Sequence, residues 1–66
     1  MKLLTAIKKA IKKVEETHGV DCSVWVQLKD KTFPYINIYG KDDISVDCSF
    51  TLDDLESKDW VVEIDY

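Results

Sequence analysis

The spacing of apolar residues changes near residue 19, and this change constrains the fold more than any other feature of the chain. From Leu3 to Val14 the apolar residues recur every three or four positions, which is the period of an amphipathic α-helix. From Cys22 onward they alternate with polar residues, which is the period of half-buried β-strands. A chain of this kind folds by burying one face of its helix against one face of its sheet.

Turn residues and capping patterns give approximate limits to each element. We expect a helix over residues 2–17, with Gly19 as its left-handed C-cap. Thr51 and Asp54 have the spacing of a capping box, which predicts the start of a short helical turn. The expected strands cover residues 22–29, 35–39, 44–50 and 59–65, and the short helical turn covers residues 51–57. The predicted fold class is α+β: an N-terminal amphipathic helix on one face of a four-stranded antiparallel sheet, with a short helical turn before the last strand.

The length of 66 residues leaves room for a single domain, residues 1–66. Its expected core joins the apolar stripe of the helix to the inward-facing strand residues. The predicted core residues are Leu4, Ile7, Ile11, Val14, Val24, Val26, Leu28, Ile36, Ile38, Ile44, Val46, Phe50, Leu55, Val62 and Ile64.

Charge is distributed unevenly along the chain. Residues 1–18 carry five lysines and two glutamates, whereas residues 19–66 carry four lysines and eleven acidic residues. The net charge is −4 and there is no arginine, so we expect no direct binding of nucleic acid. No apolar run is long enough to span a bilayer, and Lys8 and Lys9 interrupt any signal-peptide core, so the expected location is cytoplasmic. The lysine face of the helix could contact an anionic surface, but such a face is more often simply solvated, and we expect no membrane association.

The residue types that support catalysis or metal binding are scarce. Cys22 and Cys48 lie in apolar alternating runs, which favours reduced thiols over a disulfide. His18 is the only histidine, so a zinc site is not expected, and Asp42 and Asp43 lack the EF-hand pattern for calcium. With no phosphate-binding or nucleotide-binding motif, the sequence predicts a protein that is not an enzyme and carries no cofactor.

Aromatic residues gather on the sheet face that should point away from the helix. Alternation places Trp25, Tyr35 and Tyr39 there, near Asp47 and Glu63. An exposed aromatic patch usually marks an interaction surface, although cross-strand pairing of the same residues could simply stiffen the sheet. We therefore predict a partner-binding face made of these five residues, with a homodimer as one way of covering it.

Acidic residues form a second candidate surface. The clearest pairs are Asp42 with Asp43, and Asp53 with Asp54. They could serve only to keep a small protein soluble, or they could attract a basic partner such as a DNA-binding protein.

Residues 50–63 carry a resemblance to a known group of proteins. They read FTLDDLESKDWVVE, in which an acid-acid-leucine turn leads into an Asp-Trp strand. This ending resembles small bacteriophage proteins, among them anti-defence proteins of the Thoeris type that sequester a nucleotide signal. The resemblance implies a phage origin and a role in disabling a host factor. It assigns no ligand-binding residue, because residues 18–21 read HGVD where that family carries a basic segment with Gly-Trp.

These observations lead to one functional hypothesis and two alternatives. The hypothesis is a small non-enzymatic binding or inhibitory protein, encoded by a phage, that acts on a host defence or regulatory protein. The first alternative is a nucleotide sponge formed by an oligomer. The second is an acidic mimic of DNA.

Overall fold

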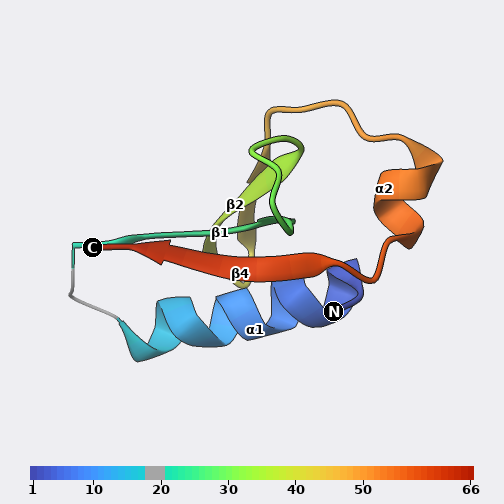
Figure 1. Cartoon of the computed structure of the whole chain (residues 1–66). Coiled ribbons are helices and arrows are strands. Elements are labelled where there is room, and N and C mark those ends of the chain that lie inside the picture. Colours follow the sequence, from blue (N-terminus) through green and yellow to red (C-terminus); the bar gives the residue numbers. More distant parts are fainter. Residues whose placement is uncertain (18–20) are drawn as a thin grey trace.

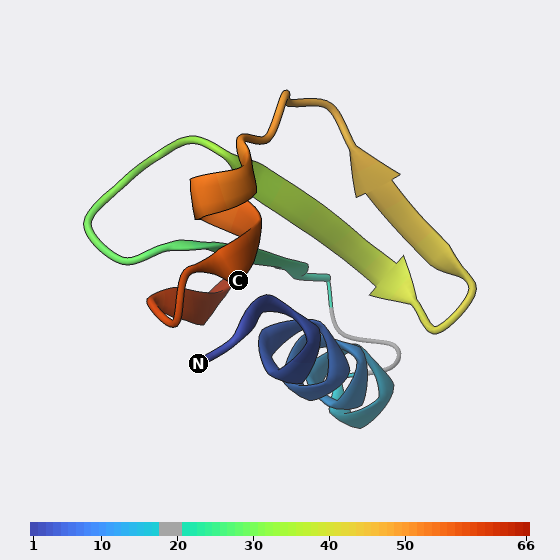
Figure 2. The ribbon, with the colours of Figure 1, turned by 90° about the vertical axis from the view of Figure 1, so that its right-hand side faces the viewer.

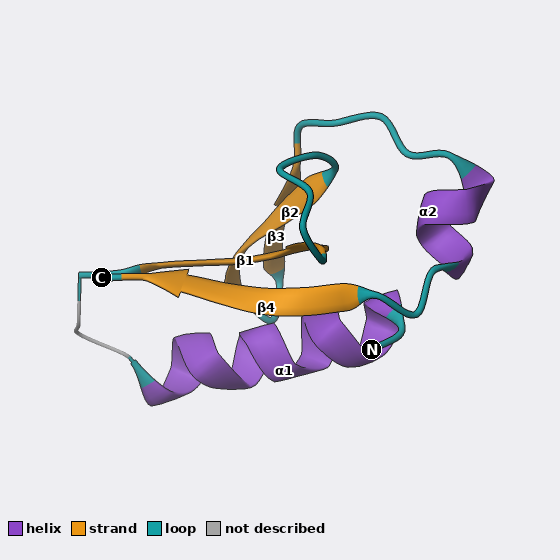
Figure 3. Cartoon of the chain, viewed as in Figure 1, coloured by secondary structure: helices purple, strands orange, loops and turns teal. Residues whose placement is uncertain are grey.

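The computed structural model describes residues 1–17 and 21–66, and it packs one long helix against one side of an antiparallel sheet (Figure 1). Along the chain the elements are α1 (Leu3–Glu16), β1 (Ser23–Leu28), β2 (Tyr35–Gly40), β3 (Asp43–Val46), α2 (Leu52–Glu56) and β4 (Trp60–Asp65). The predicted α+β fold is confirmed, including the short helix before the last strand (Figure 3).

The long helix α1 agrees with the predicted range to within one residue at each end. Thr17 closes its last turn, because the Thr17 backbone N–H donates to the Lys13 carbonyl at 3.0 Å. The Thr17 hydroxyl donates to the same carbonyl oxygen at 2.8 Å. The predicted C-cap, Gly19, lies outside the described residues.

The four strands follow the order β3-β2-β1-β4, and every neighbouring pair is antiparallel. The first three strands form a meander, whereas β4 returns to the opposite edge and pairs with β1. The chain between β3 and β4, which contains α2, therefore passes over one end of the sheet (Figures 1 and 3).

The third strand is shorter than its sequence suggests. Alternation predicts a strand over residues 44–50, but β3 ends at Val46, which pairs with Ile36. Continuing that register would place Cys48 opposite Pro34, which has no N–H to donate to a sheet ladder. Cys48 and the residues after it leave the sheet for this reason.

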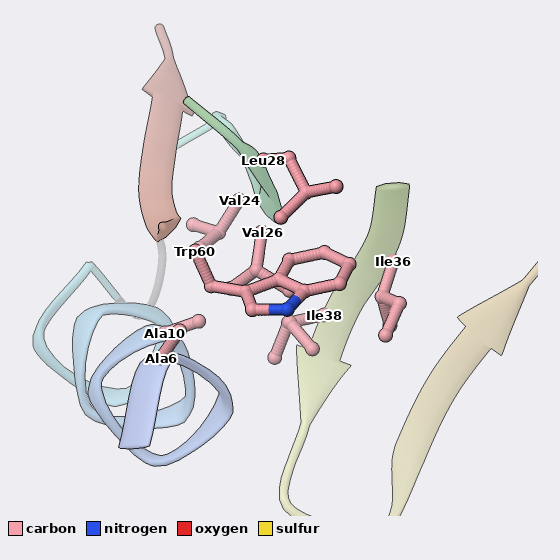
Figure 4. Packing of buried hydrophobic residues seen from close by; sticks show 8 residues of the cluster. All are labelled: Ala6, Ala10, Val24, Val26, Leu28, Ile36, Ile38 and Trp60. Carbon is pink, nitrogen blue, oxygen red and sulfur yellow. The ribbon is translucent and has the colours of Figure 1, made fainter. Parts of the chain in front are cut away.

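Eight buried apolar side chains make up the core (Figure 4). The sheet contributes mainly aliphatic residues, and the helix contributes two alanines that bring its backbone close to the sheet. Trp60, which is 0% exposed, lies between these alanines and the isoleucines of β2 (Figure 4). The buried set is Ala6, Ala10, Val24, Val26, Leu28, Ile36, Ile38 and Trp60.

The other predicted core residues fall into two groups. The first group is half-buried and packs against the core, and it comprises Ile7, Ile11, Val14, Phe50, Val62 and Ile64. For the second group the prediction was wrong, because these side chains are exposed: Leu4 (64%), Ile44 (41%), Val46 (51%) and Leu55 (49%).

The exposure of Ile44 and Val46 follows from the width of α1. The helix packs across β4, β1 and β2, and β3 projects beyond it (Figure 2). Ile44 and Val46 point to the helix side of β3, where no helix lies over them. Leu4 and Leu55 are exposed for a different reason, since they face each other across a gap between α1 and α2.

Both cysteines are free and half-buried, so neither belongs to the fully buried core. The Cys22 thiol donates to the Thr17 hydroxyl oxygen at 3.4 Å.

Candidate functional site

The sheet face opposite α1 carries the aromatic residues that the sequence places there. Register brings Trp25 of β1 between Asn37 of β2 and Glu63 of β4. Gln27 lies between Tyr35 and Val61 in the same way. We call the surface formed by Trp25, Gln27, Tyr35, Asn37 and Glu63 the aromatic face.

Trp25 is held in place by a hydrogen bond along its own strand. Its indole N–H donates to the side-chain oxygen of Gln27 at 2.7 Å. The residue is half-buried, so one part of the ring stays accessible although its polar atom is satisfied. A preordered indole loses little conformational entropy when a partner covers it.

A shallow hollow lies beside the Trp25 ring. It has a volume of about 230 Å³ and is lined by Trp25, Gln27, Thr32, Tyr35 and Asn37. The side-chain amides of Gln27 and Asn37 line it, and each carries donor and acceptor atoms, of which the Gln27 oxygen already accepts from Trp25. The neighbouring loop adds Phe33, whose ring centroid is 5.5 Å from that of Tyr35 and whose surface is 63% exposed.

The remaining two residues of the predicted site lie at its margins. Tyr39 is 60% exposed and sits at the irregular end of β2, where the pairing with β3 shifts between Ile38 and Gly40. Asp47 is exposed and follows β3, where it accepts a hydrogen bond from the Ser45 hydroxyl at 3.5 Å. The predicted set is therefore brought together in part, with Trp25, Tyr35 and Glu63 at its centre.

The predicted acidic residues do not meet at one place. Asp42 and Asp43 lie at the turn from β2 to β3, whereas Asp53 and Asp54 lie on α2, away from that turn (Figure 2). Asp54 has a structural task, since its carboxylate accepts the Thr51 backbone N–H at 3.0 Å. The acidic residues thus form separate patches.

A second surface was missed by the sequence analysis. A groove of about 560 Å³ runs between α1 and the segment from α2 to β4, with Leu3, Leu4, Ile7 and Leu55 as its apolar lining. We call it the leucine groove. The sequence does contain a sign that these two leucines are exposed. Lys8 follows Leu4 by one helical turn, and acidic residues surround Leu55 on the short helix α2. Apolar residues with charged neighbours on the same helix side lie at the edge of a buried stripe.

Other kinds of site find little support within the described residues. Residues 1–17 and 21–66 contain no cluster of three or more histidine, cysteine, aspartate or glutamate residues suited to a metal ion. In the same part of the chain, no helix has both the length and the apolar character that a membrane crossing requires. Comparisons of the chain with protein-family models, curated proteins and solved structures find no match.

Proposed function

We propose that this protein is a binding protein, without catalytic activity of its own, that docks on a partner protein through the aromatic face. One observation carries the proposal: a preordered tryptophan and a tyrosine flank a hollow on the sheet face opposite α1. Tryptophan and tyrosine contribute most to interface energies when they fill such positions. Gln27 and Asn37 supply the polar contacts that fix the orientation of a partner.

The resemblance of residues 50–63 to phage anti-defence proteins supports a further part of this proposal. The partner would be a defence or regulatory protein in the cytoplasm of a bacterial host, and binding would inhibit it. Glu63 beside Trp25 adds a negative charge to the face, which favours a partner with a basic residue near its contact surface.

Pull-down from bacterial extracts followed by reconstitution tests the proposal. Wild-type protein is immobilised beside the variants Trp25→Ala and Tyr35→Ala, with Leu52→Ala as the matched control. Leu52 is 69% exposed and lies on α2, away from the aromatic face, so its variant should bind as wild type does. A true partner is retained by wild type and Leu52→Ala, and its affinity falls by at least about tenfold in the two aromatic variants.

The retained protein is then purified and titrated calorimetrically. Unchanged affinity in both aromatic variants, with the fold intact by circular dichroism, would rule out the aromatic face as the docking surface.

A nucleotide-binding role is a second candidate, and the hollow itself favours it. An aromatic base could stack on Trp25 while Gln27 and Asn37 read its edge. The hollow is smaller than the roughly 300–1,000 Å³ of pockets that enclose small molecules, so a single chain would leave the ligand partly exposed. Bound ligand raises the melting temperature. A thermal-shift series with mono-, di- and cyclic nucleotides tests this role, and a constant melting temperature across the series excludes it.

A further inference from the structure

The leucine groove is an apolar surface that the folded chain leaves uncovered. Leu4 is 64% exposed and Leu55 is 49% exposed, although leucine is usually buried. The two leucines adjoin each other and so offer apolar surface against which another molecule can pack.

The charges that line the groove are of both signs. Lys2 and Lys58 lie in its wall together with Glu56, and all three side chains are exposed. Within residues 1–17 and 21–66, the sole salt bridge joins Lys13 to Glu16. The groove lysines and Glu56 therefore form no ion pair with one another and remain available to charges on a partner.

The apolar centre and the unpaired charges of both signs allow the groove to pair with a second copy of itself. A two-fold dimer uses the same patch on both subunits, so each residue must find its complement within that patch. A partner of uniform charge would satisfy either the lysines or Glu56 and repel the other. A second copy satisfies both. When a two-fold rotation places Glu56 of one subunit beside Lys2 and Lys58 of the other, it also places Glu56 of the other beside the lysines of the first.

We propose that two copies of this chain form a two-fold dimer through the leucine groove. Leu4 and Leu55 of each copy pack against the groove of the other, and Glu56 of each copy lies near Lys2 and Lys58 of its partner. The net charge of −4 on each chain opposes association at long range, but salt at physiological strength screens that repulsion.

The proposed dimer would leave the aromatic faces free. The groove lies beside α1, whereas the aromatic face is on the other side of the sheet. Two such faces on one particle could bind a dimeric target at both sites and so raise its apparent affinity. The dimer proposal does not depend on the proposed function, since different residues carry the two.

Sedimentation equilibrium on the full chain, over a concentration series under reducing conditions, tests the dimer directly. We expect the mass of wild type to rise from 7.6 kDa toward twice that value. Leu4→Asp and Leu55→Asp should each raise the dimer dissociation constant by at least about tenfold. Tyr39→Asp, an equally severe change at an exposed residue outside the groove, should leave it unchanged. A wild-type mass that stays at one chain up to millimolar concentration would overturn the proposal, and so would a dimer broken by Tyr39→Asp but not by the leucine variants.

Charge reversal gives a second test that leaves the apolar residues in place. The variant Glu56→Lys and the double variant Lys2→Glu with Lys58→Glu should each remain monomeric, because like charges then meet across the two-fold axis. An equimolar mixture of the two should form a heterodimer, since every pair is again of opposite sign. All three residues are exposed, and circular dichroism checks that each variant is folded. Failure of the mixture to associate, when wild type does, would show that the dimer uses another surface.

Discussion

The indole nitrogen of Trp60 donates a hydrogen bond to the backbone carbonyl of Asp54 at 2.8 Å, and this bond ties the core to α2. The same ring lies 6.1 Å, centroid to centroid, from Phe50 in the segment that leads into α2. Trp60 is 0% exposed, so its N–H has no access to water and depends on this carbonyl. One side chain therefore both fills the core and fixes the crossing between β3 and β4.

Replacing Trp60 should cost more stability than replacing the other tryptophan. Trp60→Phe removes the indole donor, so the Asp54 carbonyl keeps only the Ser57 backbone N–H at 3.3 Å. It also opens space in the core, so we expect the free energy of unfolding to fall by about 1–3 kcal/mol. Trp25→Phe, at a half-buried site, should lower it by less than about 1 kcal/mol. Urea unfolding followed by circular dichroism measures both values. Equal losses in the two variants would contradict the central role of Trp60.

The capping box of α2 should be measurable as a local contribution to stability. The Asp54 backbone N–H donates to the Thr51 hydroxyl oxygen at 3.1 Å, and the Thr51 N–H donates to the Asp54 carboxylate at 3.0 Å. Thr51→Ala removes the first bond and should destabilise α2 by about 1 kcal/mol. Amide hydrogen exchange of Leu55 and its neighbours reports this loss. Ser49→Ala, an exposed hydroxyl before the helix, is the control and should change exchange little.

The two alanines of α1 should tolerate no larger side chain. Ala10 is 0% exposed, and its methyl group sets how closely the helix approaches the sheet. Ala10→Leu forces α1 outward or displaces Trp60, which should reduce the free energy of unfolding by about 1–3 kcal/mol. Thr5→Leu adds similar volume at an exposed site and should change stability by less than about 0.5 kcal/mol. If the melting temperatures of both variants equal that of wild type, the packing around Ala10 is not tight.

Fluorescence quenching can separate the two tryptophans without any partner. Trp25 is half-buried and Trp60 is fully buried, so only the Trp25 indole should meet a quencher dissolved in water. In Trp25→Phe the remaining emission should move to shorter wavelength and resist acrylamide. If emission of that variant is quenched as strongly as that of wild type, Trp60 is more accessible than its packing implies.

Local periodicity was enough to predict the elements and the face on which each strand residue lies. The helix limits were predicted to within one residue, and alternation correctly placed Trp25 and Tyr35 opposite the core. These features depend on backbone geometry, which repeats every 3.6 residues in a helix and every two in a strand. A pattern of this kind is visible without knowledge of distant contacts.

The candidate surfaces were predicted less completely, because exposure depends on what lies above a residue. Leu4 and Leu55 satisfy the pattern of core residues, yet the gap between α1 and α2 leaves them open. The alternation through Cys48 and Phe50 likewise predicts a longer strand, but Pro34 on the neighbouring chain segment gives Cys48 no ladder partner.

The sequence by itself determined the α+β class, the approximate limits of every element except β3, and the two faces of the sheet. Only the tertiary structure decided that β4 pairs with β1, that Trp60 rather than Leu55 fills the centre of the core, and that a groove remains beside Leu4. The physical reason is that strand order and burial come from packing between segments far apart in the chain. A single helix covers three strands of this sheet, and no local pattern states which strand stays uncovered.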